Sequence, residues 1–465
     1  MNNIIYPTLD LFLYDLRNTL GEGQDELETT RDLFQKKLPE DIHEVLFQKD
    51  TVFEDDYLEL LPKKIKSFQT NSEPYPLQGY YYPVRLNDLY GLLLDCSVNN
   101  QTEPQPAASF QVLKAEIEQR LNHQSATIGQ TWMISGWLPH PNTNSPEKLA
   151  QDCYQALMPG SDWERDLEGQ GQFLGATIFE LSHYRLLIPE GTASPTNIQN
   201  IQENQQVIII LYPDRATTQK SALFYHHWLR LLSYRHKILW AYAQSRFLKR
   251  TMKNRSTDLE QHRQSISHNQ TNYREEKLRD TLVRAQDSIK NYTIELYQLE
   301  FQGSIIEINL SNYQKRLATI QERSRAIAAT AEDNLSSFDQ FTSLVTDKYL
   351  LQIAKDAENL QRILKLQEDT INAVRSRVEV EKAERDRNFQ DAIAILGVGW
   401  SVASLVAPED ESSKTNVISQ PSSPEPDSII PAAAYKLSVA LVAAALTWLL
   451  IRLWPKFMKL MSKKK

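Results

Sequence analysis

Hydrophobic positions follow three different patterns along the 465 residues of the chain. Up to about residue 215, short apolar runs alternate with polar segments. From about 220 to 390, apolar residues recur every three or four positions, and beyond 390 there are two nearly continuous apolar runs, at 392–407 and 437–453. In chain order, these patterns predict a mixed α/β domain, a set of long helices and a pair of membrane spans.

Residues 1–215 are predicted to form a cytoplasmic α/β domain. Runs rich in β-branched and aromatic residues predict strands at 89–98, 127–137, 173–181, 184–189 and 206–212. Helical periodicity predicts helices at 9–20, 40–48, 110–121 and 145–157, and the last of these begins with Ser145 as N-cap and Pro146 in the first turn. Because helices alternate with strands, we expect one sheet with helices packed against it.

The middle of the chain carries a heptad-like apolar seam. Fifteen of the 21 prolines lie at or before Pro213 and the other six at or after Pro408, and Gly303 is the one glycine between Gly191 and Gly397. Since proline and glycine usually interrupt helices, this stretch predicts long helices near 220–252, 258–332 and 336–390. Residues 216–334 are expected to form a basic helix and a long antiparallel helix, and 335–390 a stalk helix. The seam consists of Leu278, Leu282, Ala285, Ile289, Tyr292, Leu296, Leu299, Gly303, Ile306, Leu310, Tyr313, Leu317, Ile320, Ser324 and Ile327, and it resumes from Leu350 to Val378.

The C-terminal part is predicted to contain two transmembrane helices, at 391–407 and 431–455, although each apolar run is short for a span and a buried hairpin is the alternative. The loop 408–430 is acidic and rich in proline, whereas the tail 456–465 carries lysines and no acidic residue. Basic tails stay on the cytoplasmic side. We therefore expect a protein of the cell (inner) membrane with both termini in the cytoplasm and the loop on the outer side of that membrane. The predicted fold class is therefore an α+β membrane protein with an N-terminal cytoplasmic α/β domain, a long helical coiled-coil stalk and two C-terminal transmembrane helices.

The first predicted span has one face of small and weakly polar residues, which either lines a pore or lets helices pack closely. Acidic residues at its two ends would attract cations in a symmetric oligomer. The face consists of Gln390, Ala394, Gly397, Ser401 and Ser404, and the two mouths of Asp391, Glu409, Asp410 and Glu411.

A basic, aromatic segment at 220–257 contains no acidic residue and offers Arg246, Lys249 and Arg250 as a speculative anion or ligand site. The alternative is that this segment packs against acidic parts of the protein. The histidines at 226, 227 and 236 are expected at helix caps or interfaces, and the glycine-rich segment 169–175 is expected to be a plain loop, because no helix follows it.

Composition excludes several classes of protein. The chain has 51 Lys+Arg, 59 Asp+Glu and a net charge of −8, so no nucleic-acid partner is expected. Its two cysteines, Cys96 and Cys153, cannot form a disulfide framework or a cysteine metal site. No catalytic motif is found, and the protein is not expected to be an enzyme.

The order of elements resembles the CorA-type magnesium transporter family: an α/β domain, accessory helices, a long helix that enters the first span, a short outside loop, a second span and a lysine-rich end. The resemblance implies a homopentamer in the lipid bilayer, with the first span lining a pore for Mg²⁺ or another divalent cation. The family closes the outer end of its pore with Gly-Met-Asn. Here the corresponding stretch, 404–408, reads Ser-Leu-Val-Ala-Pro, so the resemblance implies divergent or lost transport.

Two functions follow from these expectations. The first is a CorA-like homo-oligomeric membrane protein that acts as a cation channel or transporter gated by its cytoplasmic domain. The second is a non-conducting, membrane-anchored coiled-coil scaffold or effector, for example in stress or defence. A nucleotide messenger bound by the basic helix is compatible with either.

Overall fold

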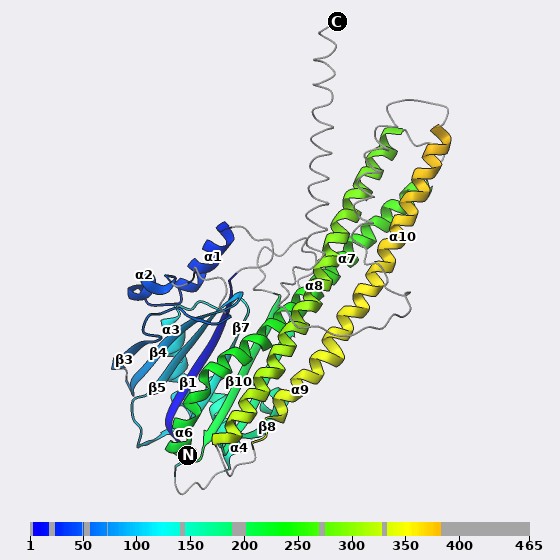
Figure 1. Cartoon of the computed structure of the whole chain (residues 1–465). Coiled ribbons are helices and arrows are strands. Elements are labelled where there is room, and N and C mark those ends of the chain that lie inside the picture. Colours follow the sequence, from blue (N-terminus) through cyan, green and yellow to red (C-terminus); the bar gives the residue numbers. More distant parts are fainter. Residues whose placement is uncertain are drawn as a thin grey trace, which may run out of the picture. The chain divides into compact units, whose positions relative to one another are not determined.

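The structure is a computed structural model that describes residues 3–17, 24–48, 50, 56–71, 73–139, 145–187, 201–268, 275–327 and 333–382 (Figure 1). The chain divides into two compact units, which are described separately. The first unit comprises Met1–Lys253 and Leu296–Asn359, and the second Asn254–Glu295 and Leu360–Lys465. The first unit contains both strands and helices, and the described part of the second is helical.

One ten-stranded sheet forms the centre of the first unit in the described residues. The strand order is β2-β4-β5-β1-β7-β10-β9-β8, with β3 paired to β4 and β6 to β1. Neighbouring strands run antiparallel except for β7 and β10, which are parallel. The strands are β1 (Asn3–Leu16), β2 (Leu58–Glu59), β3 (Lys66–Asn71), β4 (Pro76–Leu86), β5 (Leu89–Val98), β6 (Pro104–Pro106), β7 (Gly129–Trp137), β8 (Leu167–Phe173), β9 (Ala176–Leu186) and β10 (Gln202–Tyr212).

Short helices connect these strands and long helices follow them. The order β1, α1, β4, β5, α3, β7 with the sheet order β4-β5-β1-β7 is a split βαβ arrangement, and a further hairpin and β10 extend the sheet. The helices are α1 (Gln24–Gln35), α2 (His43–Leu46), α3 (Ser109–Arg120), α4 (Pro146–Leu157), α5 (Trp163–Asp166), α6 (Arg215–Ser221), α7 (Tyr225–His268), α8 (Glu275–Ile327), α9 (Ser336–Leu344) and α10 (Leu351–Lys382), with a π-helical segment, Val345–Leu350, between the last two.

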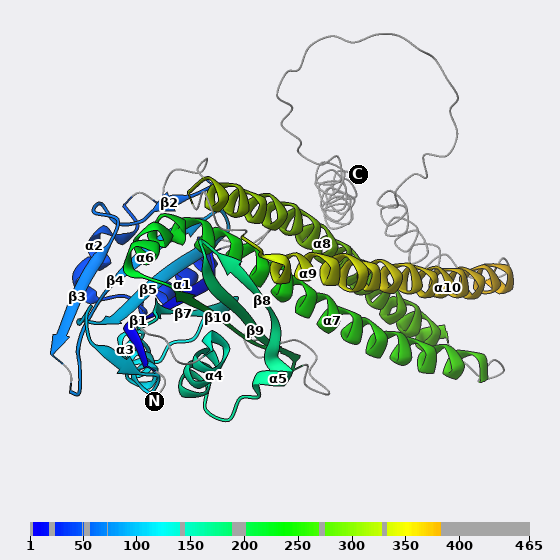
Figure 2. The ribbon, with the colours of Figure 1, turned by 90° about the horizontal axis from the view of Figure 1, so that it is seen from below.

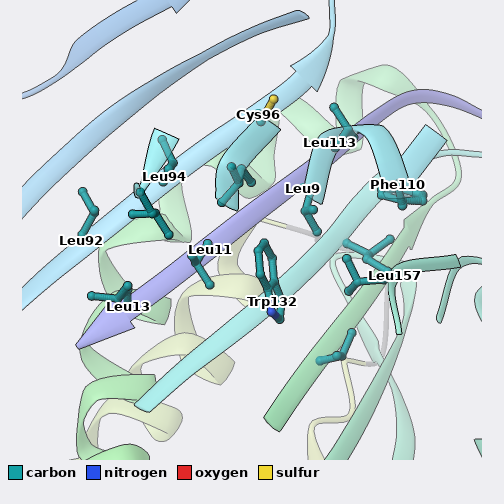
Figure 3. Packing of buried hydrophobic residues seen from close by; sticks show 14 of the residues in the cluster. Leu9, Leu11, Leu13, Leu92, Leu94, Cys96, Phe110, Leu113, Trp132 and Leu157 are labelled. Carbon is teal, nitrogen blue, oxygen red and sulfur yellow. The ribbon is translucent and has the colours of Figure 1, made fainter. Parts of the chain in front are cut away.

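One face of the sheet is packed against α1–α4 and is mainly apolar, with buried ion pairs between Lys37 and Asp15 and between Arg85 and Asp50. Figure 3 shows this packing, in which Leu9, Leu11 and Leu13 of β1 meet leucines of β5 and side chains of α3. Both cysteines are free and buried in this core. Such burial contributes roughly 25 cal/mol for each Å² of apolar surface removed from water, which makes this face the main source of stability in the unit.

The opposite face of the sheet is covered by α6 and the first part of α7 (Figure 2). The Tyr14 hydroxyl donates to the Leu229 carbonyl at 2.8 Å, and the Tyr184 hydroxyl donates to the Leu239 carbonyl at 3.2 Å. These bonds connect β1 and β9 to points about three turns apart on α7. The unit is therefore layered, with helices on both faces of the sheet.

Most predicted elements of this unit are confirmed, and one is wrong in type. The strand at 89–98 and the helices at 110–121 and 145–157 are present, and Ser145 caps α4 by accepting from the Lys148 amide. Residues 9–20 were predicted to be helical, but residues 3–16 form the strand β1. Because β1 lies between β5 and β7 and is covered on both faces, it is apolar nearly throughout and lacks the alternation that marks a half-buried strand.

The predictions for the hairpin β8–β9 need correction. The expected loop at 169–175 is strand β8 followed by a tight turn in which Leu174 and Gly175 both have positive φ. Gly171 leaves room for another segment, since a Cβ there would lie 2.0 Å from the Asn334 carbonyl oxygen. The two strands predicted at 173–181 and 184–189 are one continuous strand, β9.

The heptad-like seam is buried where it is described. From Ile289 to Ser324, the buried positions of α8 are all seam positions, and α10 buries Ile353, Ala357 and Leu360. The second helix begins later than predicted, because α7 continues to His268. In the second unit, the Tyr292 hydroxyl donates to the Leu360 carbonyl at 3.3 Å, which connects α8 with α10.

Candidate functional site

A pocket of about 300 Å³ opens on the face of the sheet covered by α6 and α7. Its floor consists of residues from β1, β4, β5 and β7, and its wall of α6 and the first residue of α7. This volume is at the lower end of the range for small-molecule sites. The lining residues are Tyr6, Thr8, Tyr80, Asp95, Gln101, Ser135, Trp137, Arg215, Thr218, Gln219, Ser221, Ala222 and Tyr225.

Strand register brings together two aspartates, of which Asp95 lines the floor of this pocket and Asp10 is fully buried beside it. Asp10 of β1 lies directly opposite Asp95 of β5, and Asp95 lies opposite Tyr80 of β4. Side chains of directly opposite residues share a face of the sheet and lie within contact distance. Two carboxyl groups and a phenol therefore form a row across three adjacent strands.

Burial strongly disfavours a second negative charge in this row. Asp10 is fully buried, and desolvation raises its pKa to about 7 although the Tyr225 hydroxyl donates to its Oδ2 at 2.7 Å. Burial, and then the charge of Asp10, hold the pKa of Asp95 well above its usual range. Two carboxyl groups this close do not both ionise, so the pair keeps at least one proton at neutral pH and carries at most a single negative charge.

Aromatic rings form much of the wall of the pocket. Tyr6 and Trp137 lie with their ring centroids 5.5 Å apart, and Tyr225 stacks on Phe12. The Tyr6 hydroxyl is held in place by Gln78 and Ser97, which donate to it at 3.0 and 3.2 Å. Burial keeps the pKa of Tyr80 and of Tyr225 well above the usual range, so both remain neutral. Neutral aromatic faces next to a single negative charge favour an organic cation.

The mouth of the pocket carries the opposite charge. Arg215 is exposed in the first turn of α6, a helix capped by Asp214, whose carboxylate accepts from the Thr217 amide at 2.8 Å. That bond lowers the pKa of Asp214 and keeps it ionised. A ligand in this pocket would thus meet one negative charge inside and one positive charge at the entrance.

A buried polar network continues across the same face beneath α7. Thr131 of β7 donates to Gln206 at 2.7 Å and contacts the Nε2 atom of His236 at 2.7 Å, and Gln206 donates to Glu180 at 2.8 Å. Arg235 of α7 lies 3.4 Å from the Glu180 carboxylate. This network holds α7 in register on the sheet, and it confirms that His236 is an interface histidine.

Two of the three basic residues proposed from the sequence are already paired with a carboxylate. Arg246 lies 2.5 Å and Lys249 2.6 Å from Asp356 of α10, and all three belong to the first unit. Arg250 also has an interaction partner. This arrangement is the one expected if the basic helix packs against acidic parts of the protein.

The remaining site residues predicted from the sequence lie outside the described residues. This applies to the small-residue face (Gln390, Ala394, Gly397, Ser401 and Ser404), to the acidic mouths (Asp391, Glu409, Asp410 and Glu411), and to both predicted spans with their loop and tail. Within the described ranges, no helix is long and apolar enough to cross a membrane. The same ranges contain no cluster of three or more His, Cys, Asp or Glu able to hold a metal ion.

The sequence reasoning did not identify the acid pair, although its two members are visible as charged residues inside apolar strands. Asp10 interrupts an apolar run in β1, and Asp95 follows three leucines in β5. A carboxylate in a central strand is rarely buried without a partner, so two strands that each contain one indicate a buried pair.

Comparisons with known proteins identify no relative of the chain, because no family model, no curated protein and no solved structure matches it.

Proposed function

We propose that the pocket binds a small molecule that carries an ammonium group. The observation that carries this proposal is the buried pair Asp10 and Asp95, which carries at most one negative charge and of which Asp95 lines the floor of an aromatic-walled pocket. An ammonium group would take the place of the shared proton as the countercharge, and the rings of Tyr6 and Trp137 would contact its substituents. Arg215 at the entrance favours ligands whose other end is anionic or polar.

Calorimetry on the full chain in detergent tests the binding step, with ethanolamine, choline and glycine as probes of a primary amine, a quaternary amine and a zwitterion. We expect binding of at least one probe, and at least tenfold weaker binding by the double variant Asp10→Asn/Asp95→Asn, because the two neutral amides leave no charge for the ammonium. Asp32→Asn, an exposed residue of α1, serves as the matched control and should bind as the unaltered chain does. Equal affinity in the two variants would contradict the proposal.

We further propose that ligand binding regulates the C-terminal segments. Tyr225, which closes the pocket and donates to Asp10, is the first residue of the 44-residue helix α7. A ligand that competes for Asp10 would therefore alter the anchoring of this helix. In this proposal the chain is a homo-oligomeric protein of the inner membrane, and its two expected spans form a cation pathway that responds to the pocket.

Cation flux through proteoliposomes distinguishes a cation pathway that responds to the pocket from a membrane anchor that conducts no ions. With the amine probe on the cytoplasmic side, we expect the flux of Mg²⁺ or a monovalent cation to change, and the double variant Asp10→Asn/Asp95→Asn to remove the response. The absence of Gly-Met-Asn at 404–408 favours the second candidate, a non-conducting membrane-anchored scaffold. That candidate predicts no flux under any condition while amine binding persists.

A further inference from the structure

A second cluster of charged residues lies between α7 and α8, and it contains no acid. His226, His227 and Arg230 belong to the first two turns of α7, and Arg316 and Arg323 are two turns apart on one side of α8. All five belong to the first unit. His227 is 2% exposed, whereas Arg323 is exposed, so the cluster extends from a buried imidazole to the surface.

The hydrogen bonding in this cluster is incomplete by one acceptor. The Arg316 guanidinium lies 3.0 Å from the Nδ1 atom of His227, and the Arg323 guanidinium lies 3.0 Å from its Nε2 atom. Guanidinium groups only donate, and a neutral imidazole accepts at one nitrogen and donates at the other. One of the two contacts therefore places a donor against a donor.

The positive charge of the cluster is also uncompensated. In the part of the chain that the structure describes, Arg230, Arg316 and Arg323 form no ion pair with a carboxylate, and the Nε atoms of Arg230 and Arg316 are buried without a hydrogen-bond partner. Two of the arginines have a tyrosine neighbour: Arg230 stacks on the Tyr57 ring, and Tyr234 lies near Arg316. Burial first, and then the neighbouring positive groups, lower the pKa of His227 to about 3, so it stays neutral.

Other buried cations of α7 are compensated differently. Arg235 is paired with Glu180, Lys237 with Asp88 and Arg246 with Asp356. Among the residues that the structure describes, the basic residues in the first two turns of α7 thus lack the carboxylate partners that Arg235, Lys237 and Arg246 have. A cation cluster without its counterion, open to the surface, is the arrangement of an anion site.

We propose that Arg230, Arg316 and Arg323, together with His227, bind the phosphate group of a phosphorylated small molecule or lipid. A phosphate dianion offers several acceptor oxygens to guanidinium forks, and one of them can accept a hydrogen bond from the ring N–H of neutral His227. It would join α7 to α8 at this point. The site shares no residue with the acid-pair pocket, so its success or failure is independent of amine binding.

Calorimetry and thermal unfolding of the full chain in detergent, with inorganic pyrophosphate as the probe, test this proposal. We expect pyrophosphate to bind and to raise the melting temperature, and Arg316→Gln and Arg323→Gln each to weaken binding at least tenfold. Arg325→Gln is the matched control, because Arg325 is exposed on the same helix, and it should bind as the unaltered chain does. Equal weakening by all three variants would overturn the proposal, as would no binding of any phosphate probe.

Two further measurements keep the test decisive. Without ligand, Arg316→Gln should melt no lower than the unaltered chain, because it removes a repelling charge; a large drop would mean that the arginines stabilise the helices without an anion. In a parallel arm, phosphatidic acid is added to the detergent micelles. Stabilisation by pyrophosphate identifies a soluble phosphate compound as the source, and stabilisation by phosphatidic acid alone identifies a lipid headgroup.

Discussion

The two faces of the central sheet are built from the same strands, but they differ in their share of apolar residues and in how their buried carboxyl groups are neutralised. On β1, Leu9, Leu11 and Leu13 point into the apolar core under α1–α4, whereas Asp10 and Tyr14 alternate with them and face α6 and α7. The first face contains leucines, aromatic rings and buried cysteines, and its buried carboxylates, Asp15 and Asp50, are paired with Lys37 and Arg85. The second contains buried carboxyl groups, a neutral histidine and an ion pair.

This difference separates the part of the molecule that stabilises the fold from the part equipped to bind. Apolar burial is favourable wherever it occurs, whereas each buried polar group must find a partner to offset its lost hydration. Thr131, Gln206 and His236 find such partners in one another. Asp10 and Asp95 do so only by retaining a proton, which leaves them ready to exchange it for another cation.

The largest expected effect comes from the apolar face. Leu11→Ala should lower the free energy of unfolding by about 3 to 5 kcal/mol, because Leu11 is 1% exposed and the rigid sheet cannot close the cavity that the substitution leaves. Chemical denaturation of the full chain, followed by circular dichroism, measures the loss. A loss below about 1 kcal/mol would show that this face is not the tightly packed one.

The neighbouring residue on the polar face should respond in the opposite direction. Folding raises the pKa of Asp10 from its ordinary value near 3.8 to about 7, so the folded protein retains a proton that the unfolded chain has lost. The contribution of Asp10 to the free energy of unfolding is fully present below about pH 4, and it is lost as the pH rises through about 7. Asp10→Asn removes the titration, and we expect it to raise the free energy of unfolding at pH 8 by up to about 4 kcal/mol, since each pKa unit corresponds to about 1.4 kcal/mol.

The pH profile provides the control for that substitution. Asp10→Asn should flatten the fall in stability between pH 4 and pH 7, whereas Asp32→Asn, exposed on α1, should leave the profile unchanged. If Asp10→Asn instead destabilised the protein equally at pH 4 and pH 8, Asp10 would be an ionised structural residue. The polar face would then not differ from the other face by retaining a proton on its buried acids.

A smaller effect is expected inside the polar network. Thr131→Val keeps the shape of the side chain but removes the hydroxyl that contacts both Gln206 and His236. The two groups left unpaired should reduce stability by about 1 to 2 kcal/mol. Gln206→Leu combined with Thr131→Val tests the assignment in a double-mutant cycle. Strictly additive losses would contradict a network between these residues.

Sequence patterns located the long helices and the seam well, because a period of three and four residues persists over many turns and identifies the buried side of α8 without knowledge of its partner. They failed at β1. A strand covered on both faces has no alternating pattern, so its apolar residues fit a helix equally well. That error also hid the site, since Asp10 in a helix would have no reason to lie beside Asp95.

The candidate sites depended on contacts that no local pattern contains. Asp10 and Asp95 are 85 residues apart in the sequence and meet through strand register, and His227 meets Arg316 and Arg323 through the packing of α7 on α8. Lys249 and Arg246, in contrast, were noticed because they cluster in the sequence. Their distant partner, Asp356, belongs to another helix.

The central claim is that the polar face holds two carboxyl groups that share a proton at neutral pH. An infrared titration of the full chain, with isotope-labelled aspartate, follows the carboxylic acid band directly. The account predicts a protonated aspartate that titrates with a midpoint near pH 7 and is absent from Asp10→Asn. If all aspartates lose their protons near pH 4 in both proteins, the acid pair does not exist as described, and the ammonium pocket has no basis.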